Sequence, residues 1–245
     1  MAKGFGYTEG LVSIVIPLYG RADLTAKCLD SIYANTEKPY ELVLVNNGST
    51  DSTVALQRLQ PEGTDLLWVS VSENVGFGRA SNAGAAVASG EFLVMLNNDT
   101  EVRAGWLEAL LAECSEEVGA VAGRLENPDG TLQHAGVTLF YDSNGTLTAE
   151  NIHEEREAGN ADCLAGTALL VRAEAFRDVG GFDPCFYNGY EDVDLSLALS
   201  QAGWGLRYTP DSVVMHHLHQ SGPSRWTHVQ DNIRRLNDQW ADLYG

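Results

Sequence analysis

An aspartate at the end of an apolar run is the first residue in this sequence whose position suggests chemistry. Residues 92–96 read Phe-Leu-Val-Met-Leu, and residues 97–100 read Asn-Asn-Asp-Thr. An apolar run without polar alternation is typical of a central parallel strand covered on both faces. Because ligands bind at the carboxyl ends of such strands, the carboxylate of Asp99 is a candidate metal ligand. Asn and Asp also favour turns and helix caps, and on this stretch alone a turn is the simpler interpretation.

A second group of carboxylates follows a run of aromatic residues. Phe186, Tyr187 and Tyr190 come just before Glu191, Asp192 and Asp194. Apolar residues at helical spacing over 195–202 place these acids in the first turn of a helix, where the helix dipole favours negative charge in any case. Aromatic rings beside carboxylates are also a common way to bind a sugar, with stacking on its apolar face and acceptors for its hydroxyls.

Histidines form the third group. Three of the six in the chain, at positions 216, 217 and 219, follow the apolar residues 213–215. A histidine cluster at the end of a strand is a candidate metal or phosphate contact, although a single histidine is more often structural.

Alternating strands and helices in the first half of the chain would position these groups. Apolar runs predict strands at 12–17, 41–45, 66–71, 92–96 and 118–122, and helical spacing between the first two predicts a right-handed βαβ unit. No Gly-x-Gly-x-x-Gly opens the first helix, which argues against a dinucleotide-binding Rossmann domain. Asn46 and Asn47 follow the second strand and could read a base or ribose edge through their amides, whereas Asp51 is expected to cap the next helix.

The loop after the third strand contains further candidate ligand contacts. Asn74, Gly76 and Arg79 lie at its mouth, and residues 80–88 continue as a helix built almost wholly of small residues. Small residues imply close approach of a neighbour, for which a packed strand or helix is the ordinary explanation. The three loop residues are better placed to meet a ligand.

Composition and charge limit the class of protein. At 245 residues, one domain with a sizeable core is expected. With 15 Lys and Arg against 34 Asp and Glu, the net charge is -19, which argues against nucleic acid as a partner because the chain repels polyanions. Bound phosphates would need a positive charge close by, for example that of a divalent cation.

The four cysteines form no Cys-x-x-Cys pair and are expected to be small buried hydrophobes. No run reaches transmembrane length and no signal peptide is recognisable, so we expect a soluble, cytoplasmic protein.

The second half of the chain is less regular. Turn sequences at 127–130 and 142–145 flank a predicted hairpin strand at 136–141, and we interpret residues 124–162 as the variable wall of a pocket. The C-terminal residues predict a helix with an apolar seam that packs on the domain or faces a partner or a further domain. This seam consists of Trp226, Val229, Ile233, Leu236, Trp240 and Leu243.

Taken together, these stretches resemble the inverting glycosyltransferases of family 2, in their rhamnosyltransferase-like branch, over nearly the whole chain. Six segments occur in the family's order. They are residues 12–17, 45–51, 73–77 with Asn82, 96–100, Gly166 with 179–183, and 190–195. The resemblance implies the A-type glycosyltransferase fold, an α/β architecture with a mostly parallel central sheet flanked by helices. It also favours the metal-ligand interpretation of Asp99 over the turn.

The resemblance also implies roles for individual residues. The family's Asp-x-Asp motif reads Asn97-Asn98-Asp99 here, so Asp99 would bind Mg²⁺ or Mn²⁺ with one charged ligand fewer than usual, and His216 would contact the metal or phosphate. Asp192 matches the catalytic base, with Glu191 beside it. The acceptor or sugar side would include Gly166, Tyr190 and Trp106. The donor nucleotide would be bound by Pro17, Tyr19, Asn46, Asn47, Asn74, Gly76, Arg79 and Asn98.

The predicted reaction is a single in-line displacement in which Asp192 deprotonates an acceptor hydroxyl. The donor would be a deoxythymidine or uridine diphosphate sugar, and the acceptor a glycan or lipid-linked glycan, with the protein in the cytoplasm or peripheral to the inner face of the membrane. A catalytically silent sugar-nucleotide-binding or scaffold module is the alternative, because the Asp-x-Asp motif is reduced. A nucleotidyltransferase is less favoured, since residues 18–21 (Leu-Tyr-Gly-Arg) are too short for its phosphate loop.

Within a single domain over 1–245, we expect a nucleotide-binding half at about 10–123, an acceptor-side half at about 124–223 and a C-terminal helix at about 224–245. The domain could also be part of a longer chain.

Overall fold

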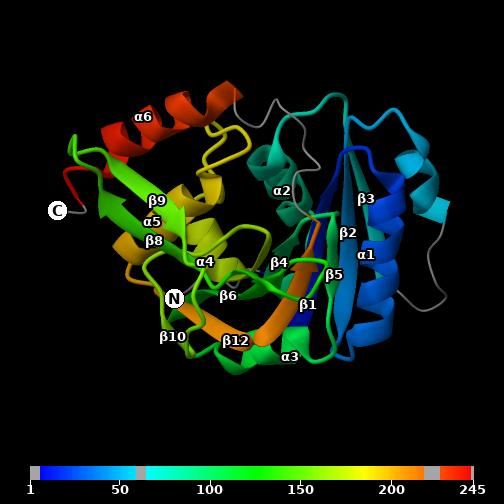
Figure 1. Ribbon diagram of the computed structural model, residues 1–245. Coiled ribbons are helices and arrows are strands. Elements are labelled where there is room, and N and C mark those ends of the chain that lie inside the picture. The colour runs from blue at the N-terminus through cyan, green and yellow to red at the C-terminus, as the bar shows by residue number, and fades with distance from the viewer. Residues whose placement is uncertain (1–5, 59–64, 218–226, 244–245) are drawn as a thin grey trace.

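A mixed ten-stranded sheet forms the centre of the protein (Figure 1). The structure is a computed structural model and describes residues 6–58, 65–217 and 227–243. The main path of the sheet runs β10-β12-β6-β11-β4-β1-β2-β3, with β5 beside β12 and β7 beside β6. The strands are β1 (Thr8–Leu18), β2 (Tyr40–Asn47), β3 (Asp65–Val71), β4 (Gly90–Leu96), β5 (Thr100–Val102), β6 (Val118–Glu126), β7 (Leu132–His134), β10 (Gly159–Asn160), β11 (Ala168–Arg172) and β12 (Gly205–His216).

The sheet is mostly parallel, as predicted. Strands β3, β2, β1 and β4 pair in parallel, and β6 and β12 run in the same direction. β11 runs the opposite way between β4 and β6. β4 lies inside the sheet, and all residues of the apolar run 92–96 are buried, so the prediction of a central covered strand is confirmed. The carboxyl ends of β1, β2, β4 and β12 therefore meet at one edge.

Helices cover both faces of the sheet. Apolar side chains of α1 (Ala22–Asn35) and α3 (Trp106–Ala112) form one core layer with β1, β2 and β4. On the other face lie α2 (Phe77–Ala85), α4 (Ala173–Asp178) and α5 (Glu191–Gln201). The small residues of α2 have the ordinary explanation, because a Cβ on Gly84 would lie 2.4 Å from Val15 Cγ1 on β1. A short 3₁₀ helix, η1 (Ser52–Arg58), follows β2, and Asp51 Oδ1 accepts a hydrogen bond from Thr53 N at its start.

The segment 124–162 contains the predicted hairpin. β8 (Val137–Tyr141) and β9 (Leu147–Asn151) form a separate two-stranded sheet. A third apolar cluster joins this hairpin to α5 and to the C-terminal helix α6 (Val229–Trp240). Figure 1 shows α6 lying across the hairpin and α5 at one end of the molecule.

The seam of α6 faces the domain. Leu236 is fully buried in the third cluster and Trp240 packs against it, whereas Leu243, just past the helix, is 62% exposed. Trp226 lies outside the described residues. Among the helices that the structure describes, none is long and apolar enough to cross a membrane.

Candidate active site

Asp99 lies in a tight turn at the carboxyl end of β4. The hydroxyl of Thr100 donates a hydrogen bond to the carbonyl of Asn97 at 2.7 Å, and Asn97 N donates to the carbonyl of Thr167 at 2.9 Å. On the other side of the turn, His217 N donates to the carbonyl of Asp99 at 2.9 Å. These bonds fix the turn between β11 and the end of β12. The backbone of Asp99 is thereby held in place, and the residue is 8% exposed.

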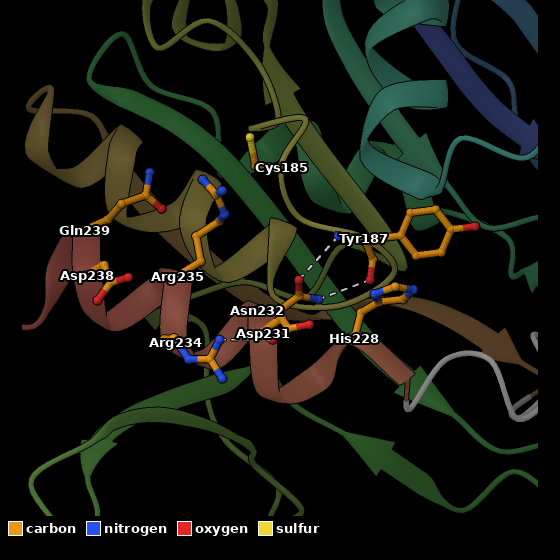
Figure 2. Close-up of a pocket in the computed structure, with 9 residues that line it drawn as sticks. All are labelled: Cys185, Tyr187, His228, Asp231, Asn232, Arg234, Arg235, Asp238 and Gln239. Atoms are coloured by element: carbon orange, nitrogen blue, oxygen red, sulfur yellow. Dashed lines mark hydrogen bonds and ion pairs between the residues drawn. The ribbon is translucent and has the colours of Figure 1, made fainter.

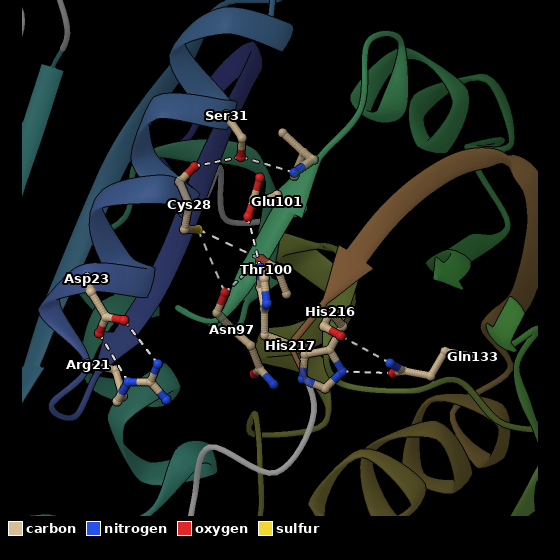
Figure 3. Close-up of polar contacts among 11 residues, drawn as sticks. Arg21, Asp23, Cys28, Ser31, Asn97, Thr100, Glu101, Gln133, His216 and His217 are labelled. Carbon is tan, nitrogen blue, oxygen red and sulfur yellow. Dashed lines mark hydrogen bonds and ion pairs between the residues drawn. The ribbon is translucent and has the colours of Figure 1, made fainter. Parts of the chain in front are cut away.

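His216, the last residue of β12, faces Asp99. Its Nε2 lies 3.4 Å from Asp99 Oδ1. Its Nδ1 lies 2.8 Å from Gln133 Oε1, a contact that Figure 3 shows. The amide nitrogen of Gln133 donates to Asn127 Oδ1 and to the carbonyl of His216, so Oε1 is the acceptor and the hydrogen lies on Nδ1. In the neutral imidazole, Nε2 then presents its lone pair to the Asp99 carboxylate.

A divalent cation fits between these two side chains. Carboxylate oxygen and imidazole nitrogen are ligands that Mg²⁺ and Mn²⁺ accept, and neighbouring ligands in an octahedral shell with bonds of about 2.1 Å lie roughly 3 Å apart. A histidine oriented through its other nitrogen is the usual arrangement around a metal. In the described parts of the chain, no group of three or more His, Cys, Asp or Glu is placed to hold a metal ion. Among the described residues, Asp99 and His216 are thus the two protein ligands that this position offers, and substrate oxygens or water could complete the shell.

Asp192 lies in the first turn of α5, and backbone donors hold its carboxylate. Its Oδ2 accepts a hydrogen bond from Gly166 N at 2.8 Å, and its Oδ1 accepts one from Val193 N at 3.0 Å. Gly166 permits this approach, because a Cβ there would lie 3.2 Å from Asp192 Cβ. The next residue, Thr167, is the one that binds Asn97. Residues 166 and 167 thus connect the carboxylate of Asp192 to the turn that carries Asp99.

The loop before α5 has an uncommon backbone conformation. Asn188 and Tyr190 have φ angles of 49° and 68°, and Gly189 has φ of 149°. Glu191, which is 7% exposed, accepts a hydrogen bond from Gly189 N through its carboxylate. Asn188 Oδ1 accepts one from Phe77 N, at the start of α2. Glu191 therefore helps to shape the loop, and Asn188 joins this loop to the loop formed by residues 74–77.

Asn47 supports the 74–77 loop. It is 4% exposed; its Nδ2 donates to Asn74 Oδ1 and the carbonyl of Gly76, and its Oδ1 accepts from Val75 N. Three hydrogen bonds engage its amide within the protein, and its contact with a base stays a prediction. Asn46 Oδ1 accepts from Ser49 N, and Asn74 Oδ1 also accepts from Gly76 N. This polar network fixes the loop that faces Asn188.

Other predicted donor contacts lie around the same edge of the sheet. Pro17 is near the end of β1, and Tyr19, just beyond that strand, is 57% exposed. Asn98 donates to the carbonyl of Gly20 and to Thr25 Oγ1, which ties the Asp99 turn to the start of α1. Arg79 is exposed and donates from Nε to the carbonyl of Pro184 at 2.6 Å.

Trp106 does not belong to this site. It is the first residue of α3 and is fully buried in the core layer that α1 and α3 form with the sheet, and its indole nitrogen donates to Thr36 Oγ1. It cannot stack on a sugar without unfolding that layer, so the sugar-contact prediction is wrong for this residue. Tyr190 is partly buried, and its hydroxyl lies 3.5 Å from Thr148 Oγ1 on β9.

Sequence reasoning missed several residues of the site. Gln133 and His134 lie on β7, a strand of three residues that is too short to show a period. Burial, followed by the nearby charges of His216 and His153, lowers the pKa of His134 to about 4, so His134 is neutral at physiological pH.

Arg21 also lies near Asp99. Its pKa is raised, first by its hydrogen bond to Asp23 and to a smaller extent by the charge of Asp99.

A cavity of about 480 Å³ lies elsewhere, along α6 (Figure 2). Its lining includes Tyr187, His228 and Asn232 and a mixture of Arg and Asp side chains. It contains neither Asp99, Asp192 nor His216, and we do not interpret it as the site of the chemistry.

Comparison with solved structures shows which fold this is. The structure is similar to a "Crystal structure of GalNAc-T7 with UDP, GalNAc and Mn2+", with a TM-score of 0.77 and 19% identity over 97% of this chain and 50% of that chain. It is also similar to the mannosyltransferase PcManGT from Pyrobaculum calidifontis in complex with GDP-Man and Mn2+, with a TM-score of 0.67 and 22% identity over 88% and 59% of the two chains. The protein has the A-type glycosyltransferase fold, as predicted.

The chain belongs to glycosyl transferase family 2, whose model matches residues 13–180. It is 34% identical to the O-antigen biosynthesis protein RfbC of Myxococcus xanthus over 84% of this chain, but it spans only 17% of that protein's length. It is 30% identical to an N-acetylglucosaminyl-diphospho-decaprenol L-rhamnosyltransferase of Mycobacterium tuberculosis, over 89% of this chain and 80% of that protein. The predicted family is confirmed, and the domain is that of a glycosyltransferase. Asp192 and His216 lie beyond the matched residues.

Proposed function

We propose that this protein is an inverting glycosyltransferase that moves a sugar from a nucleoside-diphosphate sugar to an acceptor hydroxyl, with Asp192 as the general base and a divalent cation at Asp99 and His216. The observation that supports this most directly is the junction at residues 166–167. Gly166 N holds the Asp192 carboxylate, and the carbonyl of Thr167 holds the turn of Asp99. Two adjacent residues thus bind the proposed base and the turn of the candidate cation site.

Asp192 suits the removal of a proton from the acceptor. The two backbone N–H donors and the start of α5 stabilise the negative charge of its carboxylate. As the acceptor oxygen attacks the anomeric carbon, its proton passes to Asp192. The bond between that carbon and the phosphate oxygen breaks, and the electron pair leaves with the nucleoside diphosphate, so the configuration inverts.

The leaving group needs positive charge, because the chain carries a net charge of -19. A cation held by Asp99 and His216 would supply Lewis-acid stabilisation of the diphosphate. Gln133 keeps Nε2 of His216 directed at Asp99. Arg21 also lies near Asp99, but its guanidinium is paired with Asp23. The donor nucleotide would bind between the end of β1 and the 74–77 loop.

Donor and acceptor are proposed from the relatives. The name of the relative from M. tuberculosis supports an activated rhamnose as the donor sugar and a sugar on a polyprenyl diphosphate as the acceptor. A deoxythymidine or uridine diphosphate sugar therefore remains the proposed donor. A lipid-linked acceptor would bring the protein to the inner face of the membrane.

Calorimetry with uridine, deoxythymidine and guanosine diphosphates, each with Mn²⁺ and with chelator, tests the donor site. We expect one nucleotide to bind to the wild type with Mn²⁺ and to lose most of its affinity with chelator or in Asp99→Ala. Asp65→Ala is the control, because Asp65 is an exposed carboxylate at the amino end of β3, away from the site. Failure of all three nucleotides to bind would favour the silent scaffold instead.

Turnover tests the base. Asp192→Asn keeps the size of the side chain and is expected to lower kcat by roughly 10²- to 10⁴-fold, the usual effect of losing a general base, with nucleotide binding retained. Glu174→Gln, an exposed acid in the first turn of α4, is the matched control. Near-normal turnover of Asp192→Asn would remove Asp192 from this role, and a product of retained configuration would exclude a single displacement.

A further inference from the structure

The loop that leads into α5 is held from outside by the C-terminal helix. Asn232 of α6 is 4% exposed, and its Nδ2 donates hydrogen bonds to the carbonyls of Tyr187 at 3.1 Å and Gly189 at 2.8 Å. Its Oδ1 accepts a longer bond from Tyr187 N at 3.5 Å. Figure 2 shows Asn232 directed from α6 towards Tyr187, with both bonds to that residue drawn. One buried amide therefore connects α6 to the backbone on both sides of Asn188.

This loop needs such support because its backbone is strained. Asn188 and Tyr190 are both in the left-handed region, with φ of 49° and 68°. Non-glycine residues adopt that region at a cost and keep it only where surrounding contacts enforce it. The carboxylate of Glu191 holds Gly189 N from the side of α5, and Asn232 holds the two carbonyls from the opposite side.

The same loop connects to two parts of the candidate active site, namely Asp192 on α5 and the 74–77 loop. It ends at Tyr190, two residues before Asp192, so its conformation sets where α5 starts. Asn188 Oδ1 accepts a hydrogen bond from Phe77 N, and a Cβ on Gly76 would lie 3.1 Å from the ring of Tyr187. A shift of the loop would thus move the base and the 74–77 loop together.

We infer that Asn232 is a positioning residue of the glycosyltransferase reaction. It acts through the loop at 187–190 to fix the position of Asp192 relative to the 74–77 loop. This inference rests on the proposed function, because Asp192 must be the base for its position to matter. It also assigns a part in the reaction to α6, which lies beyond the residues matched by the family model.

Asn237 provides a matched control on the same helix. Its Nδ2 donates to the carbonyl of Leu147 at 2.9 Å and its Oδ1 accepts from Leu147 N at 2.7 Å. It is an amide that bridges to backbone, as Asn232 is, but it holds the β8–β9 hairpin. Replacing either residue by alanine removes hydrogen bonds between α6 and the domain, so a purely structural role predicts similar effects for both variants.

The experiment compares Asn232→Ala and Asn237→Ala by Tm, by amide hydrogen exchange and by release of dTDP from dTDP-rhamnose with an N-acetylglucosaminyl-diphospho-polyprenol acceptor. Both variants should lower Tm. Only Asn232→Ala should speed exchange in residues 186–193 and 74–78, and only it should lower kcat, by about 10- to 100-fold, as expected for a misplaced catalytic group. If Asn232→Ala does not fold, Asn232→Ser, which keeps one donor, takes its place and should show an intermediate fall.

The two levels of the proposal fail in different ways. Equal kcat in wild type and Asn232→Ala, with exchange in 186–193 unchanged, would overturn the role of Asn232 and leave the glycosyltransferase proposal intact. If Asn237→Ala lowered kcat as much as Asn232→Ala, the effect would be one of general stability and the positioning role would be rejected. A wild type that releases no dTDP from this donor and no nucleotide from UDP-sugars would overturn the proposed function, and with it the catalytic role of the loop.

Discussion

Gln133 controls which nitrogen of His216 faces Asp99. Because its Oε1 accepts the hydrogen of Nδ1, the lone pair of Nε2 is directed at the candidate cation site. Gln133→Leu removes this acceptor, and we expect Mn²⁺-dependent binding of the nucleotide to weaken by about 10- to 100-fold, the usual cost of losing such a partner. Gln133→Glu keeps an acceptor in reach of Nδ1 and should retain most of the affinity. Calorimetry with and without Mn²⁺ checks this, and equal losses in the two variants would contradict it.

Gly166 is predicted to be needed for its lack of a side chain. A Cβ at this position would lie 3.2 Å from Asp192 Cβ and 3.5 Å from Oδ2, so Gly166→Ala has to displace the carboxylate by a few tenths of an ångström. We expect kcat to fall about tenfold with little change in nucleotide affinity, because small misplacements of a catalytic group are costly. Gly159→Ala, where an added Cβ meets nothing within 4 Å, is the control. Unchanged steady-state kinetics in Gly166→Ala would show that the contact has no role in positioning the base.

At the residue level, the sequence singled out residues whose type was unusual for their place in the pattern. Asp99 follows a fully apolar strand and His216 ends another, and the structure brings them together at 3.4 Å. Trp106 was misassigned because sequence pattern does not say where a side chain finds its partner: it packs into the core from the first turn of α3, and its indole nitrogen bonds Thr36. The bonds of Asn47 to the 74–77 loop were not predictable either. Gln133 and Asn232 were missed since their contacts lie 83 and 45 residues away along the chain.

At the scale of elements, α5 and α6 meet at a buried acid. Asp194, 5% exposed, accepts a hydrogen bond from Trp240 Nε1 at 2.8 Å. Burial raises the pKa of Asp194 to about 6; the indole hydrogen bond lowers it in part, Asp183 raises it further and Arg235 lowers it. The folded protein therefore holds this proton more tightly than the unfolded chain, whose aspartates titrate near pH 4.

This pKa predicts how the junction of α5 and α6 responds to pH. The contribution of Asp194 to stability is fully present below about pH 4 and is lost as the pH rises to about 6, since the unfolded state binds fewer protons there. Asp194→Asn cannot ionise and keeps an acceptor for Trp240. Relative to wild type, the variant should gain up to about 2–3 kcal/mol of unfolding free energy between pH 4 and pH 7. Urea denaturation at both pH values measures this, and a difference that does not vary with pH would contradict it.

Elements were predictable in proportion to their length and their burial. The runs at 12–17, 41–45 and 92–96 correspond to β1, β2 and β4, because buried parallel strands are continuously apolar. The run at 66–71 corresponds to β3, a partly exposed strand at the end of the sheet. β5, β7 and β10 have two or three residues each, too few to show any period. They exist because neighbouring strands offer them hydrogen bonds, which is tertiary information. The hairpin β8–β9 was recognisable from its turn residues at 142–145.

The topology of the whole molecule argues against two separable halves. The boundary expected at 123–124 falls inside β6 (Val118–Glu126). β11, from the second half, lies between β4 and β6, and β12 pairs with the other edge of β6. β6 therefore has no neighbour on the main path of the sheet that comes from the first half. This order of strands could not be predicted from local sequence, which does not show that a late strand inserts between two early ones.

We therefore predict that the protein unfolds as one cooperative unit. Trp68 on β3, Trp106 on α3 and Trp204 before β12 report on distant parts of the sheet, so tryptophan fluorescence and far-ultraviolet circular dichroism should give coincident urea transitions. A fragment of residues 1–123 should show no cooperative transition, because its last strand has lost both β11 and β12 and the edge of β4 is exposed. Two separate transitions in the full chain, or a cooperatively folded fragment, would instead mean that the nucleotide-binding half is stable without the strands that complete the site around Gly166.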